Sequence, residues 1–231
     1  MSQPSPADLG PLLDYLQDLG FDSLYRAGAG GPGAAEKQGS AANSSGASLA
    51  ELEQRALACK ACRLAETRKK VVFGTGDPHA RLMFVGEGPG GEEDLQGLPF
   101  VGPAGQLLNR MIQAMGHERS QVYIANIVKC RPPGNRDPQP DEVAACKGFL
   151  DGQIAAVGPR VLVALGRVAA QVLLGNETPI GRLRGNWYQY QGIPMMVTYH
   201  PAALLRNEAL KRPTWNDLQQ VRDRLREPAT T

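Results

Sequence analysis

Short, almost entirely apolar runs alternate with helix-like segments along most of this 231-residue chain. Runs at 81–85, 122–128 and 161–165 predict buried strands, and the pair 187–190 and 193–197 predicts a hairpin. Strands that are apolar on both faces need helices on both sides. The pattern therefore predicts an α/β fold with three layers, α/β/α, around a central, mostly parallel four-stranded sheet. The covering helices are expected at 103–115, 141–157, 167–174 and 214–226.

The N-terminal part of the chain differs in composition from this body. Leucines at helical spacing predict an amphipathic helical appendage over 1–26, and 27–48 is mostly Ala, Gly and Ser, which predicts a flexible linker. The main domain is expected over 49–231, beginning with a helix that Ser48 caps. Two interpretations of the appendage stay open. It either folds back or is an inert tail, or it docks onto a protein partner.

Several classes of protein are excluded by what the chain lacks. It has no apolar run of the ~20 residues that a membrane helix needs, and its first residues do not resemble a secretory signal. Four cysteines in 231 residues are too few for a disulfide scaffold. We therefore expect a cytoplasmic protein with no membrane contact, and the net charge of +2 is compatible with a polyanionic partner.

Polar residues follow the predicted strands at one end. In mostly parallel sheets, ligands bind beyond the carboxyl ends of the strands. Glu87, Asn126, Gly166 and His200 all lie at or near such ends. We expect these residues to converge in space and form a ligand site.

The cysteines are arranged as Cys59-x2-Cys62 followed by Cys130-x15-Cys146. Structural zinc usually shows two close pairs, and a redox dithiol would follow a strand rather than a helix. A four-iron cluster needs four thiolates and tolerates wide spacing. Spacing alone leaves open a cluster, a zinc site and free structural thiols.

The glycine-rich stretch 86–94 follows the first strand. It is neither a dinucleotide fingerprint nor a P-loop, because Pro89 and the acidic residues of this stretch would oppose a pyrophosphate and no Lys-Ser/Thr pair follows. Its glycines allow a ligand to approach the backbone closely. Glu87 on this turn is either a functional carboxylate or a solvated one.

Four segments in chain order carry a resemblance to a known family. They read GEGPG at 86–90, GLPFVGPAG at 97–105, NIVKCRPP at 126–133 and HPAALLRN at 200–207. Together with the cysteine pattern, they resemble the family 4 uracil-DNA glycosylases, the iron–sulfur members of the uracil-DNA glycosylase superfamily. The resemblance covers residues from about 50 to 226. One departure is Gly88, where the family usually has Ala.

The resemblance implies a uracil-DNA glycosylase-like fold and hydrolysis of the N-glycosidic bond of deoxyuridine in single- or double-stranded DNA, by a monomer. The product would be an abasic site, and no lysine is placed to form a Schiff base, so strand cleavage is not expected. The cofactor would be a 4Fe-4S cluster. Its ligands would be Cys59, Cys62, Cys130 and Cys146.

The implied roles of the site residues follow the chemistry of the reaction. Glu87 would position water, and His200 would donate to the uracil anion. Phe100 would stack on the base and Asn126 would read its edge, although a core Phe and a strand-end cap are the plainer interpretations. Glu93 would shape the pocket. Gly86 and Gly88 would let the base approach the backbone.

The segment after His200 is expected to face DNA. Leu204 or Leu205 would fill the space left by the base, and Arg206 would contact phosphate. The alternative is a helix start with buried leucines. Further phosphate candidates are Arg182, Arg184, Lys211 and Arg212.

Two functions from different classes stay open on the sequence. The first is a monofunctional glycosylase. The second is an iron–sulfur module that binds uracil-containing or single-stranded DNA without efficient turnover.

Overall fold

The computed structural model describes residues 47–227. The chain separates into residues 1–46 and a compact unit from Ala47 onward. The expected helix over 1–26 and nearly all of the linker over 27–48 lie outside the described residues, so both stay predictions.

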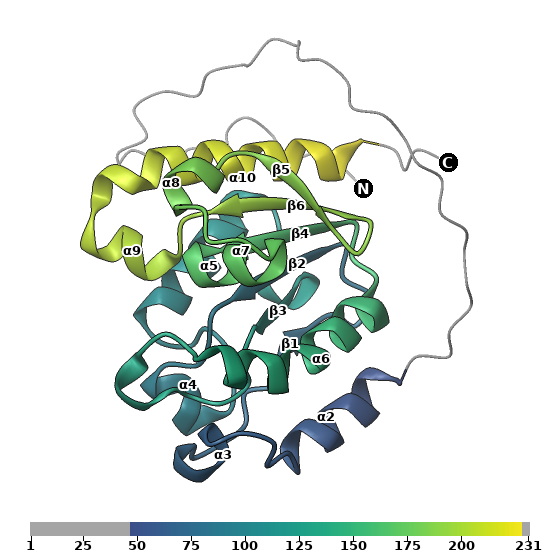
Figure 1. The fold of residues 1–231 in the computed structure, drawn as a ribbon. Coiled ribbons are helices and arrows are strands. Elements are labelled where there is room, and N and C mark those ends of the chain that lie inside the picture. The colour runs from purple at the N-terminus through teal and green to yellow at the C-terminus, as the bar shows by residue number, and fades with distance from the viewer. Residues whose placement is uncertain (1–46, 228–231) are drawn as a thin grey trace. The chain divides into compact units, whose positions relative to one another are not determined.

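A six-stranded mixed sheet forms the centre of the described unit (Figure 1). Its strands in spatial order are β1 (Thr75–Gly76), β3 (Tyr123–Asn126), β2 (Leu82–Gly86), β4 (Val161–Leu165), β6 (Ile193–Thr198) and β5 (Trp187–Tyr190). Strands β3, β2, β4 and β6 run parallel, and the two edge strands pair antiparallel to them.

The expected α/β class and the mostly parallel sheet are therefore confirmed, but the expected number of four strands is wrong. The parallel centre does contain four strands, and each edge carries one more. β1 has only two residues, which is too short to give a periodic signal in the sequence. β5 is the first arm of the expected hairpin and joins the same sheet.

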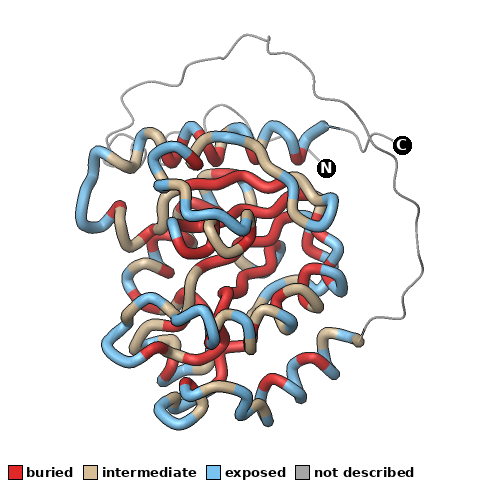
Figure 2. Tube along the Cα trace, in the orientation of Figure 1, coloured by how far each residue is buried: buried red, intermediate tan, exposed pale blue. Residues whose placement is uncertain are grey.

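Helices cover both faces of the sheet. Leu162 and Ala164 of β4 pack in one apolar cluster with Leu150 of helix α6 (Pro140–Val157) and Ala169 of helix α7 (Gly166–Leu174). Val163, which points to the opposite face, is also fully buried. Figure 2 shows the strands as the buried interior between partly exposed helices. The helices are α2 (Leu49–Leu57), α3 (Leu64–Thr67), α4 (Gly91–Gln96), α5 (Pro103–Ala114), α6 (Pro140–Val157), α7 (Gly166–Leu174), α8 (Ile180–Leu183), α9 (Pro201–Arg206) and α10 (Lys211–Arg226).

The expected helix starts agree closely with the structure. Ser48 caps α2, with its hydroxyl accepting from the Glu51 amide and the Glu51 carboxylate accepting from the Ser48 amide. Three short 3-10 turns complete the unit, at Arg119–Gln121, Pro133–Asn135 and Glu208–Leu210. Within the described part of the chain, no helix has the length and apolar character needed to cross a membrane.

Candidate active site

The carboxyl ends of the four parallel strands open onto one cavity of about 540 Å³. Glu87 follows β2, Asn126 ends β3, Gly166 follows β4 and His200 lies two residues beyond β6. All four line this cavity. The convergence expected from the topology is therefore present, and the volume is typical of a site for a small organic group.

Asn126 lies in the floor of the cavity and is almost completely buried. Its Oδ1 atom has no hydrogen-bond partner among the described residues. A buried acceptor without a partner costs about 1–3 kcal/mol. Gly86 does not line the cavity but makes room for this side chain, because a Cβ there would lie 2.4 Å from Asn126 Oδ1. The site thus holds an acceptor that a ligand donor can satisfy.

Phe100 forms a wall of the cavity, with its ring centroid 5.5 Å from that of His200 and the two planes at 32°. Its backbone has φ of 52°, which is rare for a residue with a side chain. Arg119 donates to the Phe100 carbonyl at 3.1 Å. Gly105 of α5 packs directly on it, since a Cβ there would lie 2.0 Å from the Phe100 carbonyl carbon. The sequence contains no signal that would have identified Arg119.

Glu93 lines the cavity as expected, but its carboxylate is occupied by the protein itself. Oε1 accepts from the amides of Val101 and Gly102, both at 2.9 Å, and Oε2 accepts from the Gly90 amide at 3.1 Å. Glu93 therefore ties the Gly90 loop to the Phe100 loop, and both loops line the cavity. The structure gives it a role in holding the Phe100 loop, not free oxygens for a ligand.

Glu87 carries a strongly shifted carboxyl group. Burial raises its pKa to about 7, the nearby Asp137 carboxylate adds to the shift, and Arg167 opposes it. Asp137 and Arg167 form an ion pair and also line the cavity. Sequence reasoning did not identify either of them, because they come from separate segments that carry no motif. A carboxyl group that titrates near neutrality is suited to exchange protons with water.

Next to Glu87, the glycine at position 88 lets the loop lie close to the β3 exit. A Cβ there would lie 2.8 Å from Val128 Cγ2. The departure from the usual alanine therefore relieves a close contact in this chain.

His200 is held in one orientation at the start of α9. Its Nδ1 accepts from the Ala202 amide at 3.1 Å. Burial and, to a smaller extent, the charge of Arg206 lower the pKa of His200 to about 4, against an opposing effect of Glu93. At neutral pH the ring is therefore uncharged, and because Nδ1 accepts, its proton is on Nε2. Gly166, with φ of 89°, lies against this residue, since a Cβ there would be 2.8 Å from His200 Cβ.

The segment after His200 is a short helix, and it separates the two leucine candidates. Leu204 is 2% exposed and packs in the core, whereas Leu205 is 47% exposed. Leu204 does not have the exposure expected of a DNA-facing side chain, because the i, i+1 positions of a helix point in different directions. Arg206 lines the cavity.

All four cysteines line a second cavity, between the α2–α3 turn, the exit of β3 and α6. Two nitrogens donate to sulfur there, Arg68 Nη1 to Cys130 and the Lys129 amide to Cys146, both at 3.2 Å. Burial raises the pKa of Cys146 to about 11.

The four thiols fit one kind of metal group better than another. Among residues 47–227, no three His, Cys, Asp or Glu side chains are gathered closely enough to hold one metal ion. A zinc site needs four ligands within about 2.3 Å of a single point. An iron–sulfur cluster instead attaches each thiolate to a different iron, so its ligands stand further apart. Four thiols around one cavity with N–H donors to sulfur fit a cluster better than a single ion.

One buried residue, Lys129, bonds to a residue of each cavity, through its side chain on one side and its backbone amide on the other. Lys129 Nζ donates to the Asn126 backbone carbonyl at 2.8 Å, and the Lys129 amide donates to Cys146 sulfur. Sequence reasoning placed this lysine inside a motif but gave it no role.

This geometry defines an α/β protein with a base-sized cavity at the carboxyl edge of its sheet and a cysteine-lined cavity beside it. A family model described as the uracil DNA glycosylase superfamily matches residues 73–219. The chain belongs to this superfamily and, within it, to the type-4 uracil-DNA glycosylases. Membership of a family of enzymes favours the glycosylase over the binding module.

Curated relatives named type-4 uracil-DNA glycosylase cover most of the chain. The protein of Sulfurisphaera tokodaii is 43% identical over 185 residues, which is 76% of this chain and 84% of the relative. That of Thermotoga maritima is 44% identical over 175 residues, covering 74% and 91%. That of Archaeoglobus fulgidus is 40% identical over 182 residues, covering 75% and 92%.

Proposed function

We propose that this chain releases uracil from DNA by binding a flipped-out deoxyuridine in the cavity at the carboxyl edge of the sheet. The observation that carries the proposal is the buried Asn126 Oδ1 without a partner. Uracil N3–H would supply the missing donor, and the Asn126 amide would donate to O4. Cytosine presents the opposite pattern at both positions, so a fixed Asn126 would reject it.

The uracil base must leave the base stack of the DNA to reach Asn126 in the cavity, since its glycosidic bond is inaccessible inside a duplex. Phe100 supplies the aromatic face, and base stacking contributes about 1–3 kcal/mol. Its position is held by Arg119 and Gly105, so the stacking surface exists before substrate binds.

Cleavage breaks the C1′–N1 bond and leaves the electron pair on the uracil ring. His200 is uncharged and carries its proton on Nε2, so it would donate a hydrogen bond to the developing charge on O2. Glu87 as a carboxylate would orient water toward C1′, counter the positive sugar and accept a proton from the water. Both side chains line the same cavity, as this division of roles requires.

On the DNA side, Leu205 is the exposed leucine of α9 and would fill the gap left by the base. Arg206 would contact a neighbouring phosphate. Leu204 is left out of this role because it packs in the core.

Cys59, Cys62, Cys130 and Cys146 would hold a 4Fe-4S cluster. The group would cross-link the α2–α3 turn to the β3 exit and α6, and the hydrolysis itself moves no electrons. Arg68 and the Lys129 amide would donate hydrogen bonds to two of the four sulfurs.

The test uses a labelled single-stranded oligonucleotide with one uracil, under single-turnover conditions, with hot alkali before electrophoresis. The unaltered protein should give alkali-dependent cleavage at the uracil. Glu87→Gln and His200→Gln should each slow release by about 10²–10³-fold. Matched controls are Glu53→Gln on α2 and His79→Gln in an exposed turn, which should keep the full rate. Full rates in both site variants would overturn these roles.

A further inference from the structure

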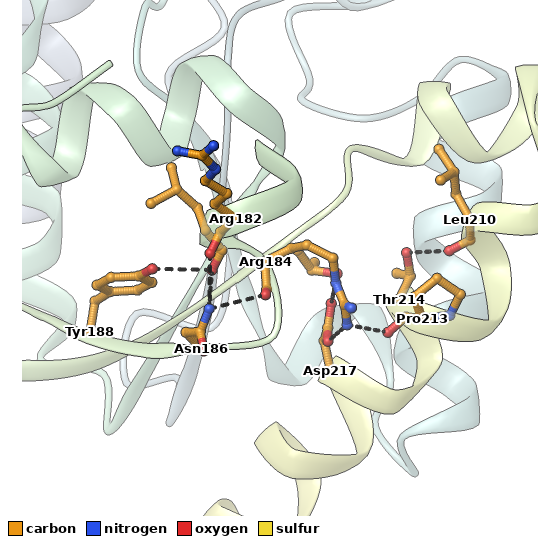
Figure 3. Close-up of polar contacts among 10 residues, drawn as sticks. Arg182, Arg184, Asn186, Tyr188, Leu210, Pro213, Thr214 and Asp217 are labelled. Carbon is orange, nitrogen blue, oxygen red and sulfur yellow. Dashed lines mark hydrogen bonds and ion pairs between the residues drawn. The ribbon is translucent and has the colours of Figure 1, made fainter. Parts of the chain in front are cut away.

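A buried carboxylate on α10 contacts the end of the strand that leads to His200. Asp217 is fully buried, and its Oδ2 accepts from the Thr198 hydroxyl at 2.6 Å. The same carboxylate accepts from Arg184, through Nε at 3.1 Å and through Nη2. Figure 3 shows Arg184 and Asp217 facing each other across the space between the α8 exit and α10.

Arg184 is committed to this network, so it is not the free phosphate contact that the sequence suggested. Its Nη2 also donates to the Pro213 carbonyl at 2.9 Å. Its guanidinium carbon lies 5.9 Å from the ring centroid of Tyr199, which lines the cavity. Gly185, with φ of 75°, leaves room for the pair, because a Cβ there would lie 3.0 Å from Asp217 Oδ1.

Thr198 is the last residue of β6 and precedes Tyr199 and His200. On one side it pairs with Leu165 of β4. On the other side, its hydroxyl is bonded to Asp217 of α10. The end of β6 is thereby fixed from both sides, one peptide before the segment that enters the cavity.

The polarity of this contact points to positioning more than to stability. Apolar side chains in the same space would avoid the cost of desolvating a carboxylate and often stabilise a fold as well or better. A hydroxyl bonded to a carboxylate, unlike an apolar contact, also fixes a direction. In this network the fixed direction is that of the chain leaving β6.

We infer that Thr198, Asp217 and Arg184 are positioning residues that hold His200 at the distance its hydrogen bond to the uracil requires. The inference rests on the proposed role of His200. None of the three lines the cavity, so each acts through the β6 end and not by contact with the base. Their removal should slow the chemical step while leaving DNA binding unchanged.

The test compares Thr198→Val, which removes the hydroxyl and keeps the shape, with Thr198→Ser, which keeps the hydroxyl. Single-turnover excision should fall about tenfold or more in Thr198→Val, since small displacements of a catalytic group are costly. Thr198→Ser should stay close to the original rate, and the KM for the oligonucleotide should be the same in both. If thermal unfolding shows that Thr198→Val does not fold, Thr198→Ala takes its place in the same comparison.

A double variant separates positioning from general destabilisation. In a His200→Ala background, Thr198→Val should slow excision no further, because the residue through which it acts is gone. An equal slowing in both backgrounds would overturn the inference. The matched control is Tyr190→Phe on β5, which removes a hydroxyl bonded to Asp151 of α6 and should keep the full rate.

Nuclear magnetic resonance of the His200 ring gives a readout independent of turnover. The pKa of His200, held low by burial, should move toward its ordinary value in Thr198→Val and stay low in Thr198→Ser. An unchanged ring and rate in Thr198→Val, with excision strongly slowed in His200→Ala, would overturn the positioning role alone. A fully active His200→Ala would instead overturn the proposed function.

Discussion

Three residues at the cavity are held in states that cost free energy in the protein alone. Asn126 buries an acceptor without a partner, Phe100 has a positive φ, and burial raises the pKa of Glu87 to about 7. Costs of this kind gather at functional sites because the surrounding structure enforces them. In the proposed function, a bound uracil would supply the missing donor to Asn126 and stack on Phe100, and Glu87 would orient the water that attacks its nucleotide.

Asn126→Asp tests the reading of the base edge. The substitution keeps the shape and an acceptor oxygen but replaces the amide donor that would bind uracil O4. We expect uracil release to slow about 10–100-fold, in line with about 1–3 kcal/mol for a buried acceptor left without its donor. The measurement is single-turnover excision, with the exposed Asn176→Asp as the matched control. An unchanged rate in Asn126→Asp would rule out donation to O4.

The pKa of Glu87 predicts how excision depends on pH. In the proposed mechanism the carboxylate is the active form, and its pKa is about 7, so the rate should rise about tenfold per pH unit below that value and level off above it. His200 stays uncharged throughout this range, since its pKa is about 4. A rate profile that is flat from acid to neutral pH would contradict the assignment.

The same shift makes a prediction about stability. Glu87 binds its proton more tightly in the folded state than in the unfolded state, so its contribution to the free energy of unfolding declines as pH rises from about 4.5 through 7. Glu87→Gln has no such proton. The variant should therefore gain stability relative to the original protein as pH rises, as measured by urea unfolding at several pH values.

At the scale of elements, the cavity is built by loops that are fixed by backbone contacts. Glu93 of α4 ties the Gly90 loop to the Phe100 loop, and α5 begins against the Phe100 carbonyl. These contacts require the loop backbone and the helix backbone to lie very close together. Residues with small side chains at the contact points therefore determine how the elements pack.

Gly105→Ala tests this packing against a matched glycine. A methyl group at Gly105 would lie 2.0 Å from the Phe100 carbonyl carbon, so α5 or the Phe100 loop must move. We expect a loss of about 1–3 kcal/mol in the free energy of unfolding and a large loss of excision. Gly148→Ala on α6 meets nothing within 4 Å and should stabilise the helix by about 0.5–1 kcal/mol without slowing excision. Equal effects of the two substitutions would argue against a packed Phe100 loop.

At the scale of the whole described unit, two cavities lie against one sheet and share the β3 exit. Asn126 and Cys130 are four residues apart, and Lys129 bonds to both neighbourhoods. The cysteine cavity lies between α2, α3 and α6. Of these helices, α6 packs on the sheet, whereas α2 and α3 make few contacts with it.

Removing the proposed cluster should therefore loosen one part of the molecule more than the rest. In Cys146→Ser we expect loss of the visible absorption and faster amide hydrogen exchange over 47–70, while β2 and β4 stay protected. Leu57→Ser, an exposed position on α2, is the control that keeps the cysteines. The cross-linking role would be refuted by identical exchange over 47–70 in the two proteins.

The sequence predicted the features of this protein that depend on residues close together in the chain. Apolar runs became the four parallel strands, and Ser48 with Glu51 became the capping box of α2. The strand-end rule brought Glu87, Asn126 and His200 to one edge, because parallel strands all end on the same side. The two-residue strand β1 and the helix α4 were missed, since neither is long enough to show a period.

Only the tertiary structure decided the state of each site residue, because burial, charge and hydrogen bonding depend on neighbours that are distant in the chain. The uncharged state of His200 arises from its burial, and the raised pKa of Glu87 arises from burial and from Asp137, which is distant in the chain. The choice between Leu204 and Leu205 depended on which side of α9 meets the core. The sequence by itself determined the fold class and the residues at the site, while long-range packing determined what each of them can do.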